Sequence, residues 1–302
     1  MTLTDVLKAT DRSLKLSTVR AGVRIGALVA PARTAEGIAR RFFSTEKPSL
    51  QRMRFSVSEP TRQTLRAPDG EVMTYRWGDV PRDPTVVLVH GWNGWAQQME
   101  RFITPLRESG LAVLAFDHVA HGTSDGRRSS LPAMIRTVEH IFAELPNVVG
   151  VIAHSLGAAA VASVLASSRR ELRAAVLIAP PSDPRPYLTM LARMLGAPQK
   201  LMLPIQQAAE RIAGVEFKRL VADPWTVRRI RTPLMIVHDI GDDEVPISNG
   251  YAYTMGMQAR MLATDGLGHR RILRDLHVVD EATGFIAQHQ PVRDQQRSLI
   301  AA

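Results

Sequence analysis

The chain of 302 residues contains no cysteine. This absence excludes disulfide bonds, thiolate-ligated zinc, iron–sulfur clusters and a cysteine nucleophile. The chain also lacks an apolar run of the roughly 18 to 20 residues that a membrane-spanning helix needs. The best candidate, from Ala21 to Ala32, is interrupted by Arg24. We therefore expect neither a disulfide-stabilised protein nor an integral membrane protein.

The positive charge of the chain is concentrated near its start. The formal net charge is +9, and residues 1–54 hold 11 Lys and Arg against 4 Asp and Glu, whereas residues 55–302 hold 27 against 25. The rest of the chain is therefore nearly neutral. No helix-turn-helix, zinc-finger or RNP-like pattern accompanies the basic residues, so we expect no nucleic-acid partner.

Residues 1–54 alternate basic and apolar side chains in the manner of a broken amphipathic helix. Such a segment either packs across the body of the protein with its arginines in water or makes a weak peripheral contact with an anionic membrane. It is a poor secretory signal, because its apolar stretch is short and acidic residues interrupt its basic region. We expect it to be retained, in a cytoplasmic protein or in one at the inner face of the membrane.

From residue 84 onward, short apolar runs alternate with segments of helical spacing, and two further strands precede them, which indicates an α/β fold. We expect a mostly parallel central sheet of about eight strands flanked by helices. The first two strands form an antiparallel hairpin around Pro68, Asp69 and Gly70. The expected strands are residues 61–66, 71–77, 85–89, 111–116, 148–152, 174–178, 234–237 and 260–263, and the expected helices between them are 95–108, 131–145, 155–168, 247–255 and 272–288.

One connection is too long for a simple crossover, which needs only about a dozen residues. About 50 residues, from about 181 to 231, separate two expected strands and carry helical patterns at 187–195 and 204–212. Because the insertion follows the carboxyl end of a strand, where such sheets bind ligands, it predicts a small helical cap. We therefore divide the chain into an N-terminal segment, 1–54, and one domain, 55–302, with a cap insertion.

The strand at 148–152 runs into Ala153-His154-Ser155-Leu156-Gly157 and then into an alanine-rich helix. This arrangement fits the G-x-S-x-G nucleophile elbow with alanine at the first glycine position, since the sharp turn requires small neighbours. A serine hydroxyl becomes a good nucleophile when a histidine accepts its proton and a carboxylate orients that histidine. The motif therefore predicts both partners further along the chain.

Both partners follow the last two expected strands. The acidic loop after residues 234–237 offers Asp242 as the carboxylate, and the glycine-containing loop after residues 260–263 presents His269 as the base. The oxyanion of an acyl-transfer intermediate needs two backbone donors. We assign these to the N–H groups of Leu156 and of Trp92, which lies in the loop after the strand at 85–89. His90, in the same loop, is interpreted as a hydrogen-bonding residue that stabilises it.

Three motifs together resemble those of the α/β-hydrolase superfamily, in its serine esterase and serine aminopeptidase-like branch. They are His90-Gly91-Trp92, the elbow around Ser155, and the loop from Asp117 to Ser124, which resembles the family's structural D-x-x-G-H-G-x-S motif. The resemblance covers about residues 61–288. It implies Asp242 as the acid, with Asp239 where glycine is usual, and leaves Asp243 and Asp183 as alternatives. It also implies catalysis without a metal or an organic cofactor.

A serine at position 155 excludes the dehalogenase and epoxide-hydrolase branches, which need an aspartate there. We expect hydrolysis of a carboxylic ester of a small to medium apolar substrate through an acyl-enzyme. Trp95, Tyr187 and Leu191 are the expected lining of an apolar acyl pocket. Alternatives are a thioesterase, an aminopeptidase or amidase, an acyltransferase, or a non-catalytic membrane-associated binding module. The sequence leaves the oligomeric state open.

Overall fold

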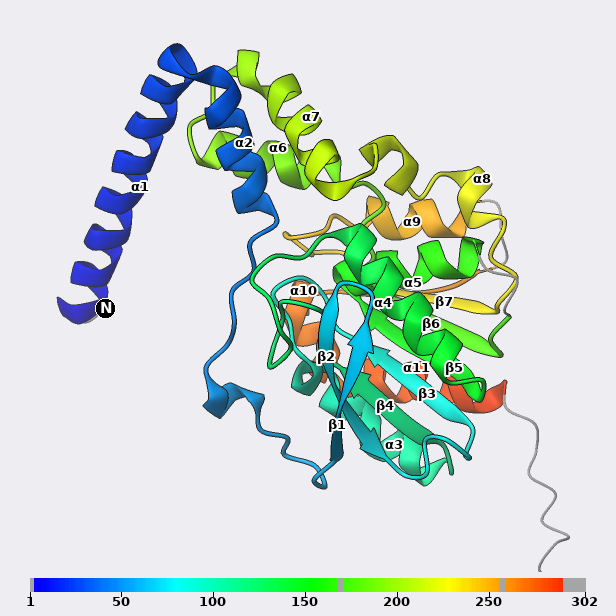
Figure 1. Ribbon diagram of the computed structural model, residues 1–302. Helices are drawn as coiled ribbons and strands as arrows, with labels where there is room; N and C mark the ends of the chain where they lie inside the picture. The colour runs from blue at the N-terminus through cyan, green and yellow to red at the C-terminus, as the bar shows by residue number, and fades with distance from the viewer. Residues whose placement is uncertain (1–2, 168–170, 256–258, 290–302) are drawn as a thin grey trace, which may run out of the picture. The chain divides into compact units, whose positions relative to one another are not determined.

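The computed structural model describes residues 3–167, 171–255 and 259–289, which divide into two compact units (Figure 1). The larger, here called the sheet unit, comprises Glu46–Gly126, Ala133–Ser182 and Ala222–Ala302. The smaller, here called the helical unit, comprises Met1–Thr45, Arg127–Pro132 and Asp183–Val221. The helical unit therefore joins the N-terminal segment with most of the inserted segment.

The sheet unit is built on one eight-stranded sheet in the order β1-β2-β4-β3-β5-β6-β7-β8. Strands β1 and β2 form an antiparallel hairpin, β2 pairs antiparallel with β4, and every further pairing is parallel. The expected fold class and all of the expected strands are confirmed. Their bounds are β1 Thr61–Ala67, β2 Gly70–Trp77, β3 Thr85–Val89, β4 Ala112–Phe116, β5 Val148–His154, β6 Ala174–Ile178, β7 Leu234–Asp239 and β8 Ala259–Thr264.

The central strands are mostly apolar because helices cover both faces of the sheet. Every residue of β3, β4, β6 and β7 is buried. On one face, Val86 and Leu88 share a core with α3 (Ile103–Glu108) and α11 (Leu276–Gln288). On the other face, α5 (Ser155–Ser167) approaches so closely that a Cβ on Gly157 would lie 3.0 Å from a methyl of Val89.

Further helices of the sheet unit differ slightly from the expected bounds. The segment expected at 95–108 begins as a 3-10 helix, η2 (Ala96–Phe102), before it continues as α3. The helix expected at 272–288 likewise begins with the short η5 (Ile272–Arg274) and resumes after Asp275, whose carboxylate caps α11. Other helices are α4 Leu131–Glu144, α8 Pro224–Val227, α9 Ser248–Thr254, α10 Gly268–Arg271 and η1 Leu50–Met53.

The helical unit has its own apolar core, which two distant parts of the chain share. Buried Ala35, Ile38 and Ala39 of α2 pack with buried side chains of α6 and α7. Proline at the first position of α2 prevents α1 from continuing, so the N-terminal segment folds as two helices. The elements of this unit are α1 Leu3–Val29, α2 Pro31–Phe42, α6 Arg185–Met194, η3 Gln199–Leu201, α7 Met202–Ala213 and η4 Phe217–Leu220.

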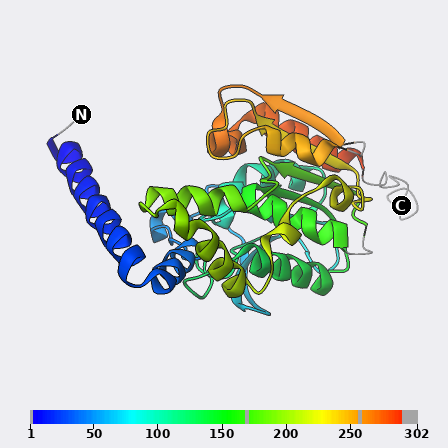
Figure 2. The same cartoon turned by 90° about the horizontal axis from the view of Figure 1, so that it is seen from above.

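The N-terminal segment therefore packs against the inserted helices through α2. In Figures 1 and 2, α1 is a single straight helix whose C-terminal end leads into α2. Within α1, Arg20 Nε donates a hydrogen bond of 2.9 Å to the carbonyl oxygen of Met194, at the end of α6. Over the described ranges, no helix is both long enough and apolar enough to cross a bilayer.

We predict that the helical unit loses stability when the N-terminal part of its core is trimmed. The side chain of Ile38 is 4% exposed and lies in this core. Ile38→Ala should therefore reduce the free energy of unfolding of the helical unit by about 2 to 4 kcal/mol. Hydrogen exchange should rise in α6 and α7 and stay unchanged in β5. Ile25→Ala, at a position that is 63% exposed, is the control. Equal protection of the α7 amides from exchange in the wild type, Ile38→Ala and Ile25→Ala would contradict the shared core.

Candidate active site

Ser155 stands at a sharp turn between β5 and α5. Its backbone φ is 52°, in the left-handed region that non-glycine residues rarely occupy. The turn is crowded, because a Cβ on Gly91 would lie 2.7 Å from the Cβ of Ser155. A Cβ on Gly157 would lie 2.2 Å from the carbonyl oxygen of His90. Such backbone strain is held at functional sites by tight surroundings, as the elbow motif predicts.

Ser155, His269 and Asp242 lie in one chain of hydrogen bonds. Ser155 Oγ is 2.9 Å from His269 Nε2, and His269 Nδ1 is 2.7 Å from Asp242 Oδ2. Because a carboxylate only accepts, the Nδ1–H must donate to Asp242, which leaves Nε2 to accept the serine proton. The three residues follow β5, β8 and β7, whose carboxyl ends share one edge of the sheet.

Asp242 is held as the charged form. Its Oδ1 accepts hydrogen bonds from the N–H groups of Glu244 and Val245, at 2.9 and 2.8 Å. Burial by itself would raise the pKa of Asp242, but the hydrogen bond from His269 and those from the backbone outweigh burial and lower the pKa. An ionised carboxylate at this position can stabilise a protonated imidazole at His269.

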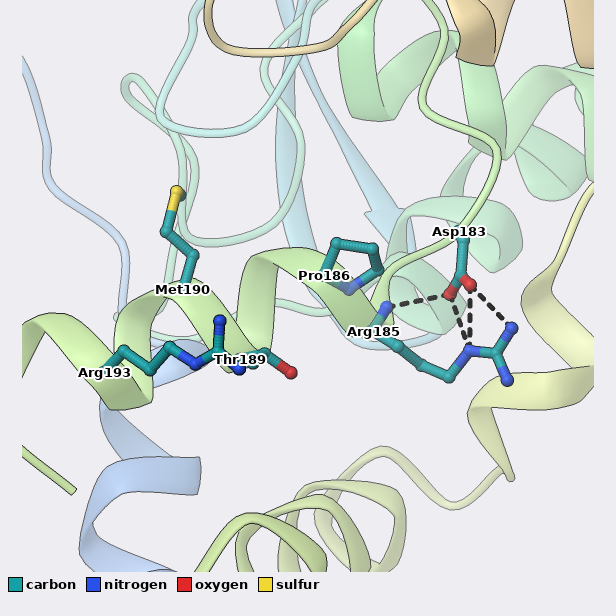
Figure 3. Close-up of a pocket in the computed structure, with 6 residues that line it drawn as sticks. All are labelled: Asp183, Arg185, Pro186, Thr189, Met190 and Arg193. Carbon is teal, nitrogen blue, oxygen red and sulfur yellow. Dashed lines mark hydrogen bonds and ion pairs between the residues drawn. The ribbon is translucent and has the colours of Figure 1, made fainter. Parts of the chain in front are cut away.

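The alternative carboxylates occupy other environments. Asp183 belongs to the helical unit and forms an ion pair with Arg185, with its Oδ2 2.6 Å from Nη2, as Figure 3 shows. Asp243 is exposed and acts electrostatically on Arg270. Of the three carboxylates considered from the sequence, Asp242 is the one that the structure joins to His269.

Asp239 links the loop that carries Asp242 to the loop that carries His269. Its Oδ2 accepts hydrogen bonds from Thr264 Oγ1 at 2.8 Å and from the N–H of Leu267 at 2.9 Å. Burial would raise the pKa of Asp239, but these backbone and hydroxyl donors outweigh it and lower the pKa. The departure from glycine at this position therefore supplies a buried, charged contact between the two loops. The sequence marked the departure without indicating this role.

Two further histidines lie against His269 and Asp242. His154 Nε2–H donates to the carbonyl oxygen of His269 at 2.9 Å, and the two rings are 4.7 Å apart. His238 Nε2–H donates to the carbonyl oxygen of Val245 at 2.8 Å and lies 3.6 Å from Asp242 Oδ2. Both hydrogen bonds hold the backbone of a loop that carries His269 or Asp242. Their positions directly before Ser155 and at the start of the acidic loop were the available sequence signal.

The two loops expected to supply the oxyanion donors meet at Ser155. Gly91 packs against the serine, and the N–H of Gly94 donates to the carbonyl oxygen of Gly91 at 3.0 Å, which folds the intervening Trp92 into a turn. Leu156 follows Ser155 directly at the start of α5. The assignment of the Trp92 and Leu156 N–H groups as oxyanion donors stays a prediction that this placement supports.

His90 connects this loop to the loop after β4. Its Nδ1–H donates to the carbonyl oxygen of Gly91 at 2.7 Å, and its Nε2 accepts from the N–H of His118 at 3.0 Å. Its ring also lies 5.3 Å from that of His121. His90 therefore stabilises the loop, as interpreted from the sequence. Buried Asp117 adds a second link, because its Oδ1 accepts from the N–H of Ala96 at 2.8 Å.

The residues expected to line an acyl pocket are distributed over both units. Trp95 is partly buried in the sheet unit, and its indole N–H donates to the carbonyl oxygen of Arg52 at 3.0 Å. Tyr187 and Leu191 are partly buried residues of α6 in the helical unit. The contact of these side chains with a substrate stays a prediction.

Comparison with protein-family models matches residues 81–240 to the family described as serine aminopeptidase, S33. A search of curated protein sequences finds no match. Among solved structures, a monoacylglycerol lipase from Paleococcus ferrophilus is similar at a TM-score of 0.57 and 19% identity, covering 72% of this chain and 99% of that chain. The thioesterase domain from the curacin biosynthetic pathway has a TM-score of 0.56 and 17% identity, covering 76% and 99%.

A bacterial membrane phospholipase A is similar over more of the chain. Its TM-score is 0.57 at 14% identity, and the match covers 95% of this chain and 96% of that chain. At such low identity these structures show a shared fold.

Five buried histidines predict that acid destabilises the sheet unit. Burial lowers the pKa of His90 to about 4 and the pKa values of His121 and His154 to about 3, and it lowers those of His118 and His238 as well. Unfolded histidines take up protons below about pH 6.5. The unfolded chain therefore binds more protons, and the free energy of unfolding should fall from about pH 7 to about pH 4. Each histidine contributes about 1.4 kcal/mol per pH unit over the range in which it is protonated in the unfolded chain and neutral in the folded protein.

Denaturant unfolding followed by tryptophan fluorescence at several pH values tests this dependence, because all 4 tryptophans lie in the sheet unit. His121→Gln should make the slope shallower by about 1.4 kcal/mol per pH unit. His277→Gln, at an exposed histidine, should leave it unchanged. A stability that is constant between about pH 7 and pH 5 would contradict the neutral, buried histidines.

We predict that Asp239→Ala lowers turnover by misplacing His269. The substitution removes the acceptor of the Thr264 and Leu267 hydrogen bonds, so we expect kcat for a soluble ester to fall about tenfold or more, with KM nearly unchanged. The labelling rate of Ser155 by a fluorophosphonate should fall in parallel. Asp239→Asn, which keeps an acceptor oxygen, should recover part of the loss. Asp243→Ala, at the exposed neighbour, is the control. A wild-type kcat in Asp239→Ala would show that the contact is dispensable.

Proposed function

The chain belongs to the serine aminopeptidase S33 family of α/β-hydrolases, and we propose that it is a serine hydrolase acting on carboxylic esters of small to medium apolar substrates. The observation that carries this proposal is the hydrogen-bonded chain from Ser155 through His269 to Asp242. The Ser155 hydroxyl faces the Nε2 that would accept its proton, and the Nδ1–H of His269 faces the carboxylate of Asp242. The lipase and thioesterase among the similar structures are consistent with an acyl substrate.

In the proposed cycle, Ser155 Oγ attacks the ester carbonyl carbon while His269 Nε2 takes the serine proton. The tetrahedral intermediate carries its negative charge on the former carbonyl oxygen, which accepts hydrogen bonds from the N–H groups of Trp92 and Leu156. The intermediate then expels the alcohol, which receives the proton from His269, and leaves an acyl group on Ser155. Water, deprotonated by the same imidazole, releases the acid and regenerates the serine.

The hydrogen bonds and ion pairs of the acidic residues favour ester substrates over peptide substrates with a free amino terminus. Recognition of an α-ammonium group needs a carboxylate with acceptor capacity to spare. Around the loop that follows β7, the oxygens of Asp242 and Asp239 already accept hydrogen bonds from protein donors, and Glu244 pairs with Arg270 at 2.8 Å. These carboxylates of the sheet unit are therefore engaged in structural contacts. We rank ester and thioester hydrolysis above aminopeptidase activity for this reason.

We predict that Ser155→Ala abolishes both fluorophosphonate labelling and ester turnover. Loss of the nucleophile should lower kcat for p-nitrophenyl esters by at least about 10⁴-fold. Ser167→Ala, at an exposed serine of the same helix, should keep wild-type activity. The screen should include matched thioesters and aminoacyl amides, with the ester giving the highest kcat/KM.

Three outcomes would contradict parts of this proposal. Full labelling of Ser155→Ala would remove the assigned nucleophile. A folded wild-type protein without any adduct would favour a non-catalytic role for the hydrolase fold. A preference for aminoacyl amides over esters would keep the triad and replace the substrate class.

A further inference from the structure

The last turns of α1 carry an apolar surface that faces away from the core of the helical unit. Ile25, Leu28 and Val29 are 63%, 74% and 79% exposed. Ala27 of the same turns is buried in the core, and Arg20 holds this helix to α6. At 3.6 residues per turn, Ile25 and Val29 lie nearly opposite Ala27, and Leu28 lies about 100° from it, one turn beyond Ile25. Large aliphatic groups so close together on a surface indicate an interaction site.

Exposed apolar side chains are also frequent elsewhere on the helical unit. In the described part of the chain, eight of the 13 large hydrophobic residues that are exposed belong to this smaller unit. On α6, Met190 and Arg193 are among the residues that line an open pocket of about 500 Å³, and Figure 3 shows these lining residues. The eight are Val19, Ile25, Leu28, Val29, Met190, Met194, Leu203 and Ile212.

The helical unit carries all of the positive charge surplus of the chain. Its three segments hold 16 Lys and Arg against six Asp and Glu, a surplus of ten, whereas the whole chain has a surplus of nine. The sheet unit therefore has a net charge near −1. Arg24 and Arg33, which flank the apolar surface of α1 along the sequence, are exposed. Neither side chain forms a hydrogen bond or an ion pair with another described residue.

We propose that the helical unit docks on the surface of an anionic lipid bilayer, with α1 lying in the plane of the interface. Ile25, Leu28 and Val29 enter the boundary between headgroups and acyl chains, and Arg24 and Arg33 contact lipid phosphates. An interfacial helix binds through buried apolar area together with electrostatic attraction to anionic lipids, and α1 offers both. This docking is independent of the reaction catalysed at Ser155.

The charge distribution favours a bilayer over a second copy of the chain. A symmetric dimer through this surface would bring two units, each with a surplus of ten positive charges, against one another. An anionic bilayer instead compensates the charge and also takes up the aliphatic side chains. A nucleic acid would satisfy the arginines through its phosphates but would leave the apolar surface in water.

Flotation of the full chain with lipid vesicles tests the proposal. The protein should bind vesicles that contain about one third phosphatidylglycerol in phosphatidylcholine, and it should bind pure phosphatidylcholine at least about tenfold more weakly, since each cation contributes about fivefold near an anionic surface. Binding should weaken as salt rises from 0.05 to 0.5 M, because salt screens surface charges. Ile25→Ser with Leu28→Ser should reduce binding about tenfold or more, and Arg24→Glu with Arg33→Glu by a similar factor.

The control is Leu276→Ser, at an aliphatic residue of the sheet unit that is 70% exposed, and it should bind as the wild type does. All variants should keep the circular dichroism spectrum and the fluorophosphonate reactivity of the wild type, which shows that they are folded. The proposal is overturned if the wild type fails to bind anionic vesicles or if the α1 variants bind undiminished. It is also overturned if light scattering shows that the wild type is a dimer and that the variant with Ile25→Ser and Leu28→Ser is a monomer. Loss of nucleic-acid binding in the α1 variants, with vesicle binding unchanged, would overturn it as well.

Discussion

The strained backbone of Ser155 is the constraint on which the site depends. A positive φ at a serine costs on the order of 1 to 3 kcal/mol, and it persists only where the surroundings leave no alternative. Here β5 on one side, α5 on the other and the backbone at His90 and Gly91 enclose the turn. The absence of a Cβ at Gly91 and Gly157 is what permits this approach. The same contacts bring the loop that carries Trp92 next to Ser155.

Buried histidines and carboxylates connect the loops around this turn. His90 joins the loop after β3 to the loop after β4, and His154 joins the elbow to the backbone of His269. Asp239 joins the loops that follow β7 and β8. These residues are hydrogen-bonded within the protein, so the loops hold one another in place. The consequence is a site whose order depends on histidines that remain neutral.

The two units divide the physical properties of the chain between them. The sheet unit holds Ser155, His269 and Asp242 and is close to neutral. The helical unit holds the positive charge and most of the exposed aliphatic surface among the described residues. It forms because α2 alone cannot bury its apolar face and the inserted helices α6 and α7 supply a partner. The N-terminal segment is thus part of a folded core, with a second apolar face on α1 left exposed.

The strands and the likeness to α/β-hydrolases followed from the sequence alone, because buried parallel strands and the steric demands of the elbow leave local patterns. The order of a serine, a carboxylate and a histidine also followed, since each lies in the segment after a strand that ends at one edge of the sheet.

Other features were decided by the tertiary structure. Contacts between distant segments determine which carboxylate contacts His269. They also determine that Asp239 links two loops and that α2 shares a core with helices some 150 residues away. Local patterns carry no record of such contacts. A side chain's neighbours along the chain limit its backbone conformation, but its neighbours in space set its hydrogen bonds, its burial and its charge state.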